Sequence, residues 1–242
     1  MNEKTLSQRL QLVASFLPEA ACFADIGSDH AYLPCFVCLN DSQAIAVAGE
    51  VNEGPFQSAK RTVEELGLAD KIEVRKGDGL SVLREDEVTE VTIAGMGGGL
   101  ISHILEQGKD KLTSVNRIIA QPNVDANVVR KWFYENNYEL TSERIIEEDG
   151  HIYEILVGDK GQNHSIYSEF YLESQFLFGP FLLLEKPQPF KRKWESEKEK
   201  KEYALEQMKK AKFPDWRKIS HFEHEIKVIQ EVLSNEQGYS SQ

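Results

Sequence analysis

The chain has 242 residues, 40% of them apolar and 28% charged, so it can bury a core and is not a disordered segment. Its 28 basic and 40 acidic residues give a net charge of −12, which argues against a protein that coats nucleic acid non-specifically. The N-terminus lacks the basic-then-apolar layout of a signal peptide, and no apolar run reaches the roughly 18–20 residues that span a bilayer. We expect a cytoplasmic protein without a membrane anchor.

The first predicted element is an amphipathic helix, in which Leu6, Leu10, Val13 and Leu17 recur at helical spacing before Pro18. Short apolar runs then alternate with helix-like stretches. The runs are residues 22–26, 45–48, 72–74, 88–94 and 117–120, and the stretches are residues 30–39, 55–66, 99–107 and 125–136. This alternation predicts an α/β fold with a Rossmann-like, doubly wound and mainly parallel sheet. A hairpin of residues 138–146 and 152–157 is expected to complete the sheet.

The last third of the chain is predicted to be helical. Residues 166–178 look helical, Phe190–Lys212 form a charged helix with a thin apolar stripe, and a second stripe runs from Phe222 to Leu233. Two such helices joined by a short turn predict an antiparallel, coiled-coil-like hairpin. The expected domains are residues 1–160 and residues 161–242, with a disordered tail at 238–242. Because the hairpin can bury its stripes against itself, we expect a monomer.

The cysteines do not predict a metal or disulfide site. Cys22, Cys35 and Cys38 are too few and too clustered for a disulfide framework. Cys35 and Cys38 form a C-x-x-C motif, but no second pair follows, and the motif lies on the apolar face of a predicted helix. We therefore expect buried thiols and no metal.

Loops rich in glycine or small polar residues follow all five predicted parallel strands. The carboxyl ends of such strands share one edge of the sheet, where ligands of doubly wound folds bind. The loops are residues 25–34, 49–55, 77–80, 95–99 and 121–123. We expect the functional site at this edge.

The first loop argues for a cofactor without phosphate. It has a single glycine, Gly27, followed by Asp29, in place of the G-x-G-x-x-G phosphate cradle, which disfavours an oxidoreductase that uses nicotinamide. S-adenosylmethionine fits, because its sulfonium and ammonium suit Asp25 and Asp29, its ribose diol suits Glu50, and its adenine amino group suits Asp78. The full predicted cofactor set is Asp25, Gly27, Ser28, Glu50, Val51, Asn52, Asp78, Gly79, Gly95, Met96 and Gly97. The alternative is structural, with Asp25 or Asp78 capping helices and residues 77–79 forming a plain turn.

These motifs together resemble the bacterial tRNA (adenine-22-N1)-methyltransferase family. The segments that carry the resemblance are residues 25–34 (DIGSDHAYLP), 50–55 (EVNEGP), 77–80 (GDGL), 93–98 (IAGMGG), 121–123 (QPN) and 146–154 (IEEDGHIYE). The resemblance covers roughly residues 5–235. It implies a class I S-adenosylmethionine-dependent methyltransferase with a C-terminal helical extension, which methylates N1 of an adenine in the D-loop region of tRNA.

Three residues after the first strand are candidates for catalysis. The N1 lone pair of neutral adenine lies in the ring plane, so methyl transfer to it needs no prior removal of a proton. We expect Asp29 to stabilise the positive charge that develops on the target base, with His30 and Tyr32 orienting or stacking on that base. The alternative is that Asp29 caps the next helix, His30 packs on it and Tyr32 belongs to the core.

Two further groups of residues are candidates for contacts with tRNA. Gln121, Pro122 and Asn123 are predicted to bind a base edge, although a turn explains the same residues. Lys186–Lys218 hold 12 basic and 6 acidic residues, so phosphate contacts are expected there, although a solvated helix face is the alternative. The predicted phosphate contacts are Lys191, Arg192, Lys193, Lys198, Lys200, Lys201, Lys209, Lys210 and Lys212.

Two other functions remain open from the residues alone. A methyltransferase of another RNA or of a small molecule would use the same cofactor loops. A non-catalytic nucleotide-binding or RNA-binding module would keep these loops without turnover.

Overall fold

The structure, a computed structural model, describes residues 5–235. The chain divides into two compact units, Met1–Gly179 and Pro180–Gln242. The tail expected to be disordered, residues 238–242, lies outside the described residues. Within residues 5–235, no helix is long and apolar enough to cross a membrane.

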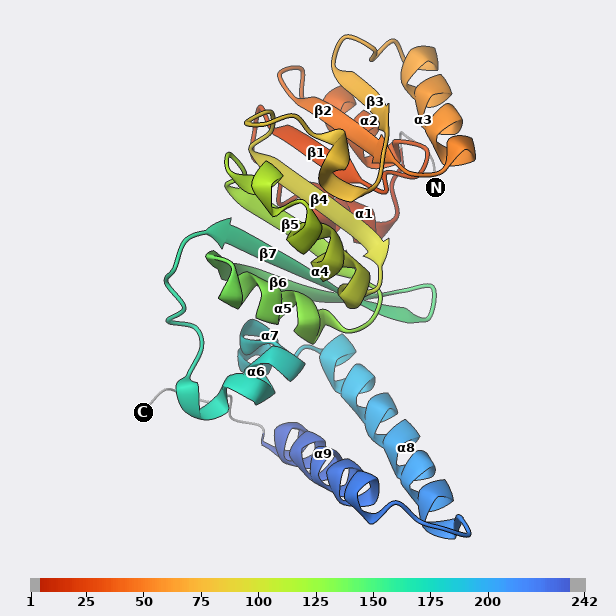
Figure 1. Cartoon of the computed structure of the whole chain (residues 1–242), viewed down its shortest axis with the longest axis vertical. Coiled ribbons are helices and arrows are strands. Elements are labelled where there is room, and N and C mark those ends of the chain that lie inside the picture. The colour runs from red at the N-terminus through yellow and green to blue at the C-terminus, as the bar shows by residue number, and fades with distance from the viewer. Residues whose placement is uncertain (1–4, 236–242) are drawn as a thin grey trace. The chain divides into compact units, whose positions relative to one another are not determined.

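The first unit is built on a seven-stranded sheet with the order β3-β2-β1-β4-β5-β7-β6 (Figure 1). The strands are β1 (Cys22–Ile26), β2 (Ile45–Glu50), β3 (Ile72–Lys76), β4 (Glu90–Met96), β5 (Arg117–Pro122), β6 (Tyr138–Glu148) and β7 (His151–Lys160). Strands β1 to β5 pair in parallel, and β7 pairs antiparallel with both β5 and β6. The expected doubly wound, mainly parallel sheet with a closing hairpin is confirmed.

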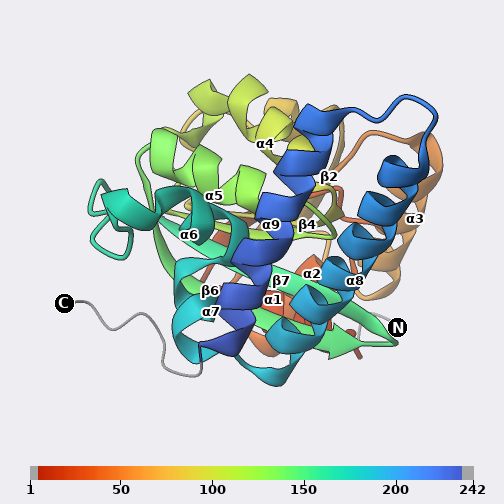
Figure 2. The ribbon, with the colours of Figure 1, turned by 90° about the horizontal axis from the view of Figure 1, so that it is seen from below.

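Helices cover both faces of this sheet. The helices of the first unit are α1 (Gln8–Ala14), α2 (Tyr32–Asn40), α3 (Glu53–Glu65), α4 (Gly98–Gln107), α5 (Ala126–Glu135) and α6 (Leu172–Phe178), with 3₁₀ turns at Gly79–Val82, Lys109–Leu112 and Glu169–Tyr171. Apolar side chains of α1, α2 and α3 pack on one face of the strands, whereas α4 and α5 lie over the other (Figures 1 and 2). Each face thus buries an apolar layer, which explains why the central strands are mostly apolar.

The C-x-x-C motif lies inside one of these layers. Cys35 and Cys38 are buried in the cluster that α2 and α3 form with β1 and β2, and burial raises the pKa of the Cys38 thiol to about 11. A thiol with so high a pKa stays protonated near neutral pH, which suits a packing role. Among residues 5–235, no three His, Cys, Asp or Glu side chains are grouped so that they could hold a metal ion.

Residues 161–179 belong to the first unit, so the division lies later than the expected boundary at residue 160. The reason is a buried arginine on α5. The Arg130 guanidinium donates to the carbonyl oxygens of Phe176 (3.0 Å) and Leu177 (3.3 Å), which holds the end of α6 against α5. The helix expected over residues 166–178 is shorter, because residues 169–171 form a 3₁₀ turn before α6.

The second unit is an antiparallel helical hairpin preceded by a short helix. Its helices are α7 (Pro180–Glu185), α8 (Gln188–Lys210) and α9 (Trp216–Ser234). Helix α9 buries Ile219, Ile226, Ile229 and Val232 at the spacing of one helix face. Asp215 caps α9 by accepting hydrogen bonds from the backbone N–H groups of Arg217 and Lys218, which fixes where the second helix begins.

Candidate active site

Backbone hydrogen bonds tie together the loops that follow the parallel strands. The N–H groups of Gly27 and Ser28 both donate to the Gly49 carbonyl, at 3.0 and 3.2 Å, which fastens the loop after β1 to the end of β2. The Gly77 N–H donates to the Glu50 carbonyl, and the Asn123 N–H donates to that of Met96. All five loops therefore lie along one edge of the sheet, which has its topological switch point between β1 and β4.

Asp25 anchors the first of these loops from inside the sheet. Its carboxylate is buried and accepts hydrogen bonds from the Ser28 and Thr92 hydroxyls, both at 2.6 Å. Burial raises the pKa of Asp25 to about 6, against the lowering effect of the two hydroxyls, and the nearby Glu50 raises it further. Its bonding partners are side chains, so Asp25 is not a helix cap.

Because its pKa is raised, the buried Asp25 should make the folded protein less stable as pH rises. Between about pH 4 and 6 the folded protein keeps this proton while the unfolded chain loses it, so Asp25 lowers the free energy of unfolding as pH rises. The Asp25→Asn variant lacks this effect. Relative to it, the wild-type protein should lose about 2–3 kcal/mol of stability between pH 4 and pH 7. Urea titrations of both proteins at the two pH values measure the difference, and parallel pH profiles would contradict it.

The chain takes a left-handed turn immediately after this anchor. Asp29, His30 and Ala31 have φ angles of 36°, 58° and 56°, a conformation that non-glycine residues rarely adopt singly and hardly ever in succession. The buried carboxylate of Glu50 accepts a hydrogen bond from the Asp29 N–H and thereby holds the turn. Burial also raises the pKa of Glu50. Backbone strain held by surrounding bonds is typical of functional sites.

The turn brings the three catalytic candidates together. The Asp29 side chain is 69% exposed and has a carboxylate oxygen 3.4 Å from His30 Nε2. The His30 ring stacks on Tyr32, with 5.1 Å between ring centroids, and its Nδ1 lies 2.5 Å from the Ser58 hydroxyl. Helix α2 has Ala31 as its N-cap and no side-chain cap, so Asp29 does not cap it. Tyr32 is half-buried against the core, which fits both interpretations of that residue.

The other acidic candidate, Asp78, is also open to a ligand. Its side chain is exposed and makes no cap bond to the 3₁₀ turn that it precedes. Gly79, with φ of 52°, begins that turn, and Val51 and Asn52 are exposed after β2. The edge therefore presents exposed polar groups on both sides of the buried Glu50.

Two glycines of these loops, Gly27 and Gly98, leave no room for a side chain. A Cβ on Gly27 would lie 2.2 Å from Met96 Cε, and one on Gly98 would lie 2.0 Å from the Asp125 carbonyl oxygen. The Met96 side chain thus packs on Gly27, which also has a positive φ of 72°. At Gly98 the close approach of the Asp125 backbone is the specific reason for glycine.

The predicted base-edge residues are mostly internal. Strand β5 extends through Pro122, so Gln121 and Pro122 are buried and Asn123 is exposed. The Gln121 carboxamide oxygen accepts from the Gly95 N–H at 3.0 Å and its Nε2 donates to Asn123, whose own amide donates to the Gly95 carbonyl at 2.8 Å. The prediction of base contacts for Gln121 and Pro122 is corrected, because both residues are buried and the Gln121 carboxamide is bonded to the Gly95 loop.

Arg9 borders the candidate site and was not predicted from the sequence. Its guanidinium donates to the Gln121 carboxamide and lies 5.1 Å from the ring centroid of Tyr153. A cation supplied by α1 therefore lies beside the Gly95 loop. No motif marks Arg9, and its partners lie more than a hundred positions away, so only its place in the first helix could have drawn attention to it.

The basic residues of α8 are partly neutralised. Lys200 pairs with Glu197 at 2.8 Å, Lys201 with Glu225 at 3.1 Å and Lys209 with Glu223 at 2.6 Å. Lys198 and Lys210 pair with acids one turn away on the same helix. Much of the positive charge that was expected to bind phosphate is thus neutralised by glutamates of the same hairpin.

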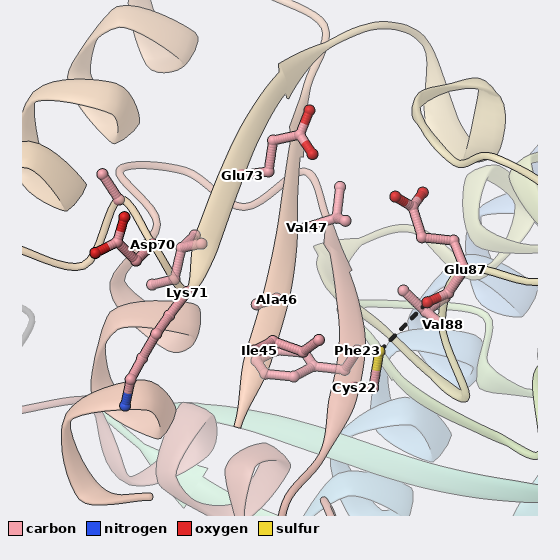
Figure 3. Close-up of a pocket in the computed structure, with 12 residues that line it drawn as sticks. Cys22, Phe23, Ile45, Ala46, Val47, Asp70, Lys71, Glu73, Glu87 and Val88 are labelled. Carbon is pink, nitrogen blue, oxygen red and sulfur yellow. Dashed lines mark hydrogen bonds between the residues drawn. The ribbon is translucent and has the colours of Figure 1, made fainter. Parts of the chain in front are cut away.

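A cavity of about 410 Å³ lies at the opposite edge of the sheet. Its walls come from the first residues of β1 and β2 and from the segments that precede β3 and β4, among them Cys22, Ile45, Lys71 and Val88 (Figure 3). The Cys22 thiol donates to the Glu87 carbonyl at 3.3 Å across it. None of the five loops contributes to this cavity, so it is separate from the candidate site.

Comparisons with known proteins find similar methyltransferases over nearly the whole chain. The family model described as tRNA (adenine(22)-N(1))-methyltransferase matches residues 23–231. A Bacillus subtilis tRNA (adenine(22)-N(1))-methyltransferase is 46% identical over 97% of this chain and all of its own length. The crystal structure of the B. subtilis M1A22 tRNA methyltransferase covers 96% of this chain and 100% of its own, with a TM-score of 0.91 and 45% identity. A Streptococcus pneumoniae protein in complex with S-adenosyl-L-methionine covers 95% and 100%, with a TM-score of 0.84 and 43% identity.

Proposed function

The chain belongs to the tRNA (adenine(22)-N(1))-methyltransferase family, and we propose that the five loops at the carboxyl edge of its sheet form the active site. The protein is an enzyme that transfers a methyl group from S-adenosylmethionine to N1 of adenine 22 in tRNA. The observation that carries the assignment of the site is the left-handed turn, which holds an exposed Asp29 next to the stacked His30 and Tyr32.

The residues at this edge fit S-adenosylmethionine. Two features of the loop after β1 disfavour a pyrophosphate, namely its single glycine and the exposed Asp29. Glu50 would accept hydrogen bonds from the ribose diol, and Asp78 would accept one from the adenine amino group. Asp25, whose oxygens are bonded to Ser28 and Thr92, would act by holding the loop and by its negative charge. When bound, the cofactor supplies a methyl group on a positively charged sulfur.

Glu50 provides the test of the cofactor site. In the Glu50→Gln variant the amide oxygen can still accept from the Asp29 N–H, but the charged acceptor for the ribose is lost. We expect the dissociation constant for S-adenosylmethionine to rise about 10- to 100-fold, the usual effect of losing hydrogen bonds to a charged group. Isothermal titration calorimetry measures it.

The matched control is Glu53→Gln, three residues later. Glu53 is exposed and pairs with Lys76 at 2.5 Å, and loss of such a surface pair should change cofactor affinity by less than about 2-fold. Equal affinities of the Glu50→Gln variant and the wild-type protein would remove Glu50 from the cofactor site.

The residues of the turn have different tasks in the transfer. Adenine N1 carries its lone pair in the ring plane, so no residue has to act as a base before attack. Asp29 would accept a hydrogen bond from the amino group of the target base and stabilise the positive charge that the base acquires. His30 and Tyr32 would stack on the base and align N1 with the methyl group. Because N1 lies on the pairing edge, the base must first leave its stack.

The proposal also covers tRNA binding by the second unit, the oligomeric state and the location of the enzyme in the cell. We place the tRNA-binding extension at residues 180–242 and assign phosphate contacts to Lys191, Arg192 and Lys193 near the start of α8. The enzyme would act as a monomer in the cytoplasm, where its tRNA substrate is found.

The reaction is tested by supplying S-adenosylmethionine with a labelled methyl group and unmodified tRNA, followed by nucleoside analysis. We expect 1-methyladenosine as the labelled product. A tRNA whose adenine 22 is replaced by guanine should accept no label. Label in another nucleoside, or label only with other RNA or small-molecule acceptors, would overturn the substrate assignment. Cofactor binding without any transfer would favour a non-catalytic module.

A further inference from the structure

The turn of the α8–α9 hairpin exposes two aromatic rings. Phe213 is 85% exposed and Trp216 is 67% exposed, and they lie only three positions apart. Lys212, Arg217 and Lys218 are also exposed. We call residues 212–218 the hairpin tip. Exposed rings this large need a partner to be removed from water, since large apolar residues are seldom left on the surface in a group.

The rings of the hairpin tip do not serve to pack the hairpin. We call the apolar interface between α8 and α9 the seam. On α9 the seam begins after the hairpin tip with Ile219 and continues through Ile226 and Ile229, all of which are buried. The Lys212 amine lies 5.7 Å from the ring centroid of Phe213, and both rings are largely exposed. Both rings could therefore be removed without opening the seam.

The charge of the hairpin tip is positive and unneutralised. Among residues 5–235, no ion pair involves Lys212, Arg217 or Lys218. Asp215, the acid of the hairpin tip, accepts from the Arg217 and Lys218 N–H groups as the cap of α9. The lysines in the body of α8, by contrast, are largely paired with glutamates. Cations without an ion pair to any described residue thus lie beside the exposed rings of the hairpin tip.

We propose that the hairpin tip binds unpaired bases of the tRNA, with Phe213 and Trp216 stacking on the bases and Lys212, Arg217 and Lys218 binding the flanking phosphates. The inference rests on the proposed function and refines it. Aromatic rings interleaved with cations are the usual means of binding single-stranded nucleic acid, because every base has a face that can stack. Folded RNA offers such bases in its loops, whereas its paired regions present phosphate and ribose. The hairpin tip therefore contacts a loop of the tRNA.

The double variant Phe213→Ala/Trp216→Ala tests the stacking. We expect its dissociation constant for unmodified tRNA to rise about 10- to 100-fold, because each stacked ring contributes substantially to binding. The variant Phe213→Tyr/Trp216→Phe keeps two rings and should stay within about 3-fold of the wild-type protein. The control is Phe170→Ala, a ring that is 93% exposed in the first unit and should leave tRNA affinity unchanged.

The cations are tested by the salt dependence of tRNA binding. Replacing Lys212, Arg217 and Lys218 by Gln should lower the slope of log affinity against log salt by about 2 to 3, roughly one for each lost phosphate contact. S-adenosylmethionine affinity and helical content, measured on the same proteins, should equal those of the wild-type protein. An unchanged slope, with cofactor affinity and helical content intact, would remove these three cations from tRNA binding.

The outcomes separate this inference from the proposed function. If the wild-type protein makes no 1-methyladenosine, the proposed function fails. If it does, and the Ala double variant binds tRNA as tightly as the wild-type protein, the hairpin tip does not bind bases. If the double variant instead turns a dimer into a monomer and keeps its tRNA affinity, the hairpin tip binds a second copy of the chain. Sedimentation equilibrium measures that last property.

Discussion

Asp29→Asn should lower kcat for methyl transfer about 100- to 1000-fold, the range seen when one electrostatic stabiliser of a transition state is removed. Asn tolerates the left-handed conformation nearly as well as Asp, so the turn should persist. The bond from the Asp29 N–H to Glu50 is a backbone bond and also persists. What the variant loses is the negative charge that we propose lies beside the target base. Single-turnover rates with S-adenosylmethionine and tRNA measure the effect.

The control for this variant is Asp149→Asn in the turn between β6 and β7. Asp149 is also exposed and left-handed, with φ of 52°, but it lies outside the candidate site. It should leave kcat unchanged. Cofactor affinity of Asp29→Asn should stay within about 3-fold of wild type, since its contribution lies in the transition state rather than in binding. Near-normal turnover with intact cofactor binding would remove Asp29 from catalysis.

Arg130→Met should cost about 3–5 kcal/mol of unfolding free energy, because it leaves two buried carboxylates without their cation. The fully buried guanidinium donates to Glu143 on β6 and to Glu154 on β7, both at 2.5 Å. It also binds the carbonyls at the end of α6. Urea unfolding measures the loss, and α6 should exchange its amide hydrogens faster.

The triple variant Arg130→Met/Glu143→Leu/Glu154→Leu separates charge burial from packing. Replacing all three charges by apolar side chains should recover most of the lost stability, since a buried ion cluster contributes little net free energy. A triple variant as unstable as Arg130→Met would show that the shape of the cluster, rather than its charge, holds this region. Lys131→Met is the matched control: Lys131 is the next residue of α5, exposed and paired with Glu135 at 3.8 Å.

The strands were predictable because burial on both faces gives continuous apolar runs. The predicted run 22–26 matches β1, and the expected starts of β2, β3 and β5 agree with the structure. Their ends were placed too early. Glu50, Lys76 and Pro122 continue the backbone ladder although they interrupt the apolar pattern, because pairing depends on backbone groups and only the pattern depends on side chains.

The site was predictable to the extent that it follows from topology. Loops after parallel strands must meet at one edge, and Gly27, Glu50 and Gly95 lie at that edge as their spacing predicted; their cofactor contacts remain a prediction. Gln121 was not, since a buried amide and an exposed amide look alike in a sequence. Arg9 was missed because its contact to Gln121 joins residues far apart in the chain. The pairing of lysines on α8 with glutamates on α9 depends on the register of the hairpin, which apolar spacing alone does not fix.

The turn at Asp29–Ala31 is a locally frustrated segment in a fold whose other parts agree with their sequence. Three successive left-handed residues each oppose their own backbone preference, and the turn persists because Glu50 and Gly49 hold it from the neighbouring strand. A change that loosens the end of β2 would let the turn relax toward commoner backbone conformations while the sheet stayed intact. The loop would then unfold locally at a lower free energy than the rest of the molecule. Heating would therefore abolish methyl transfer before it unfolded the sheet.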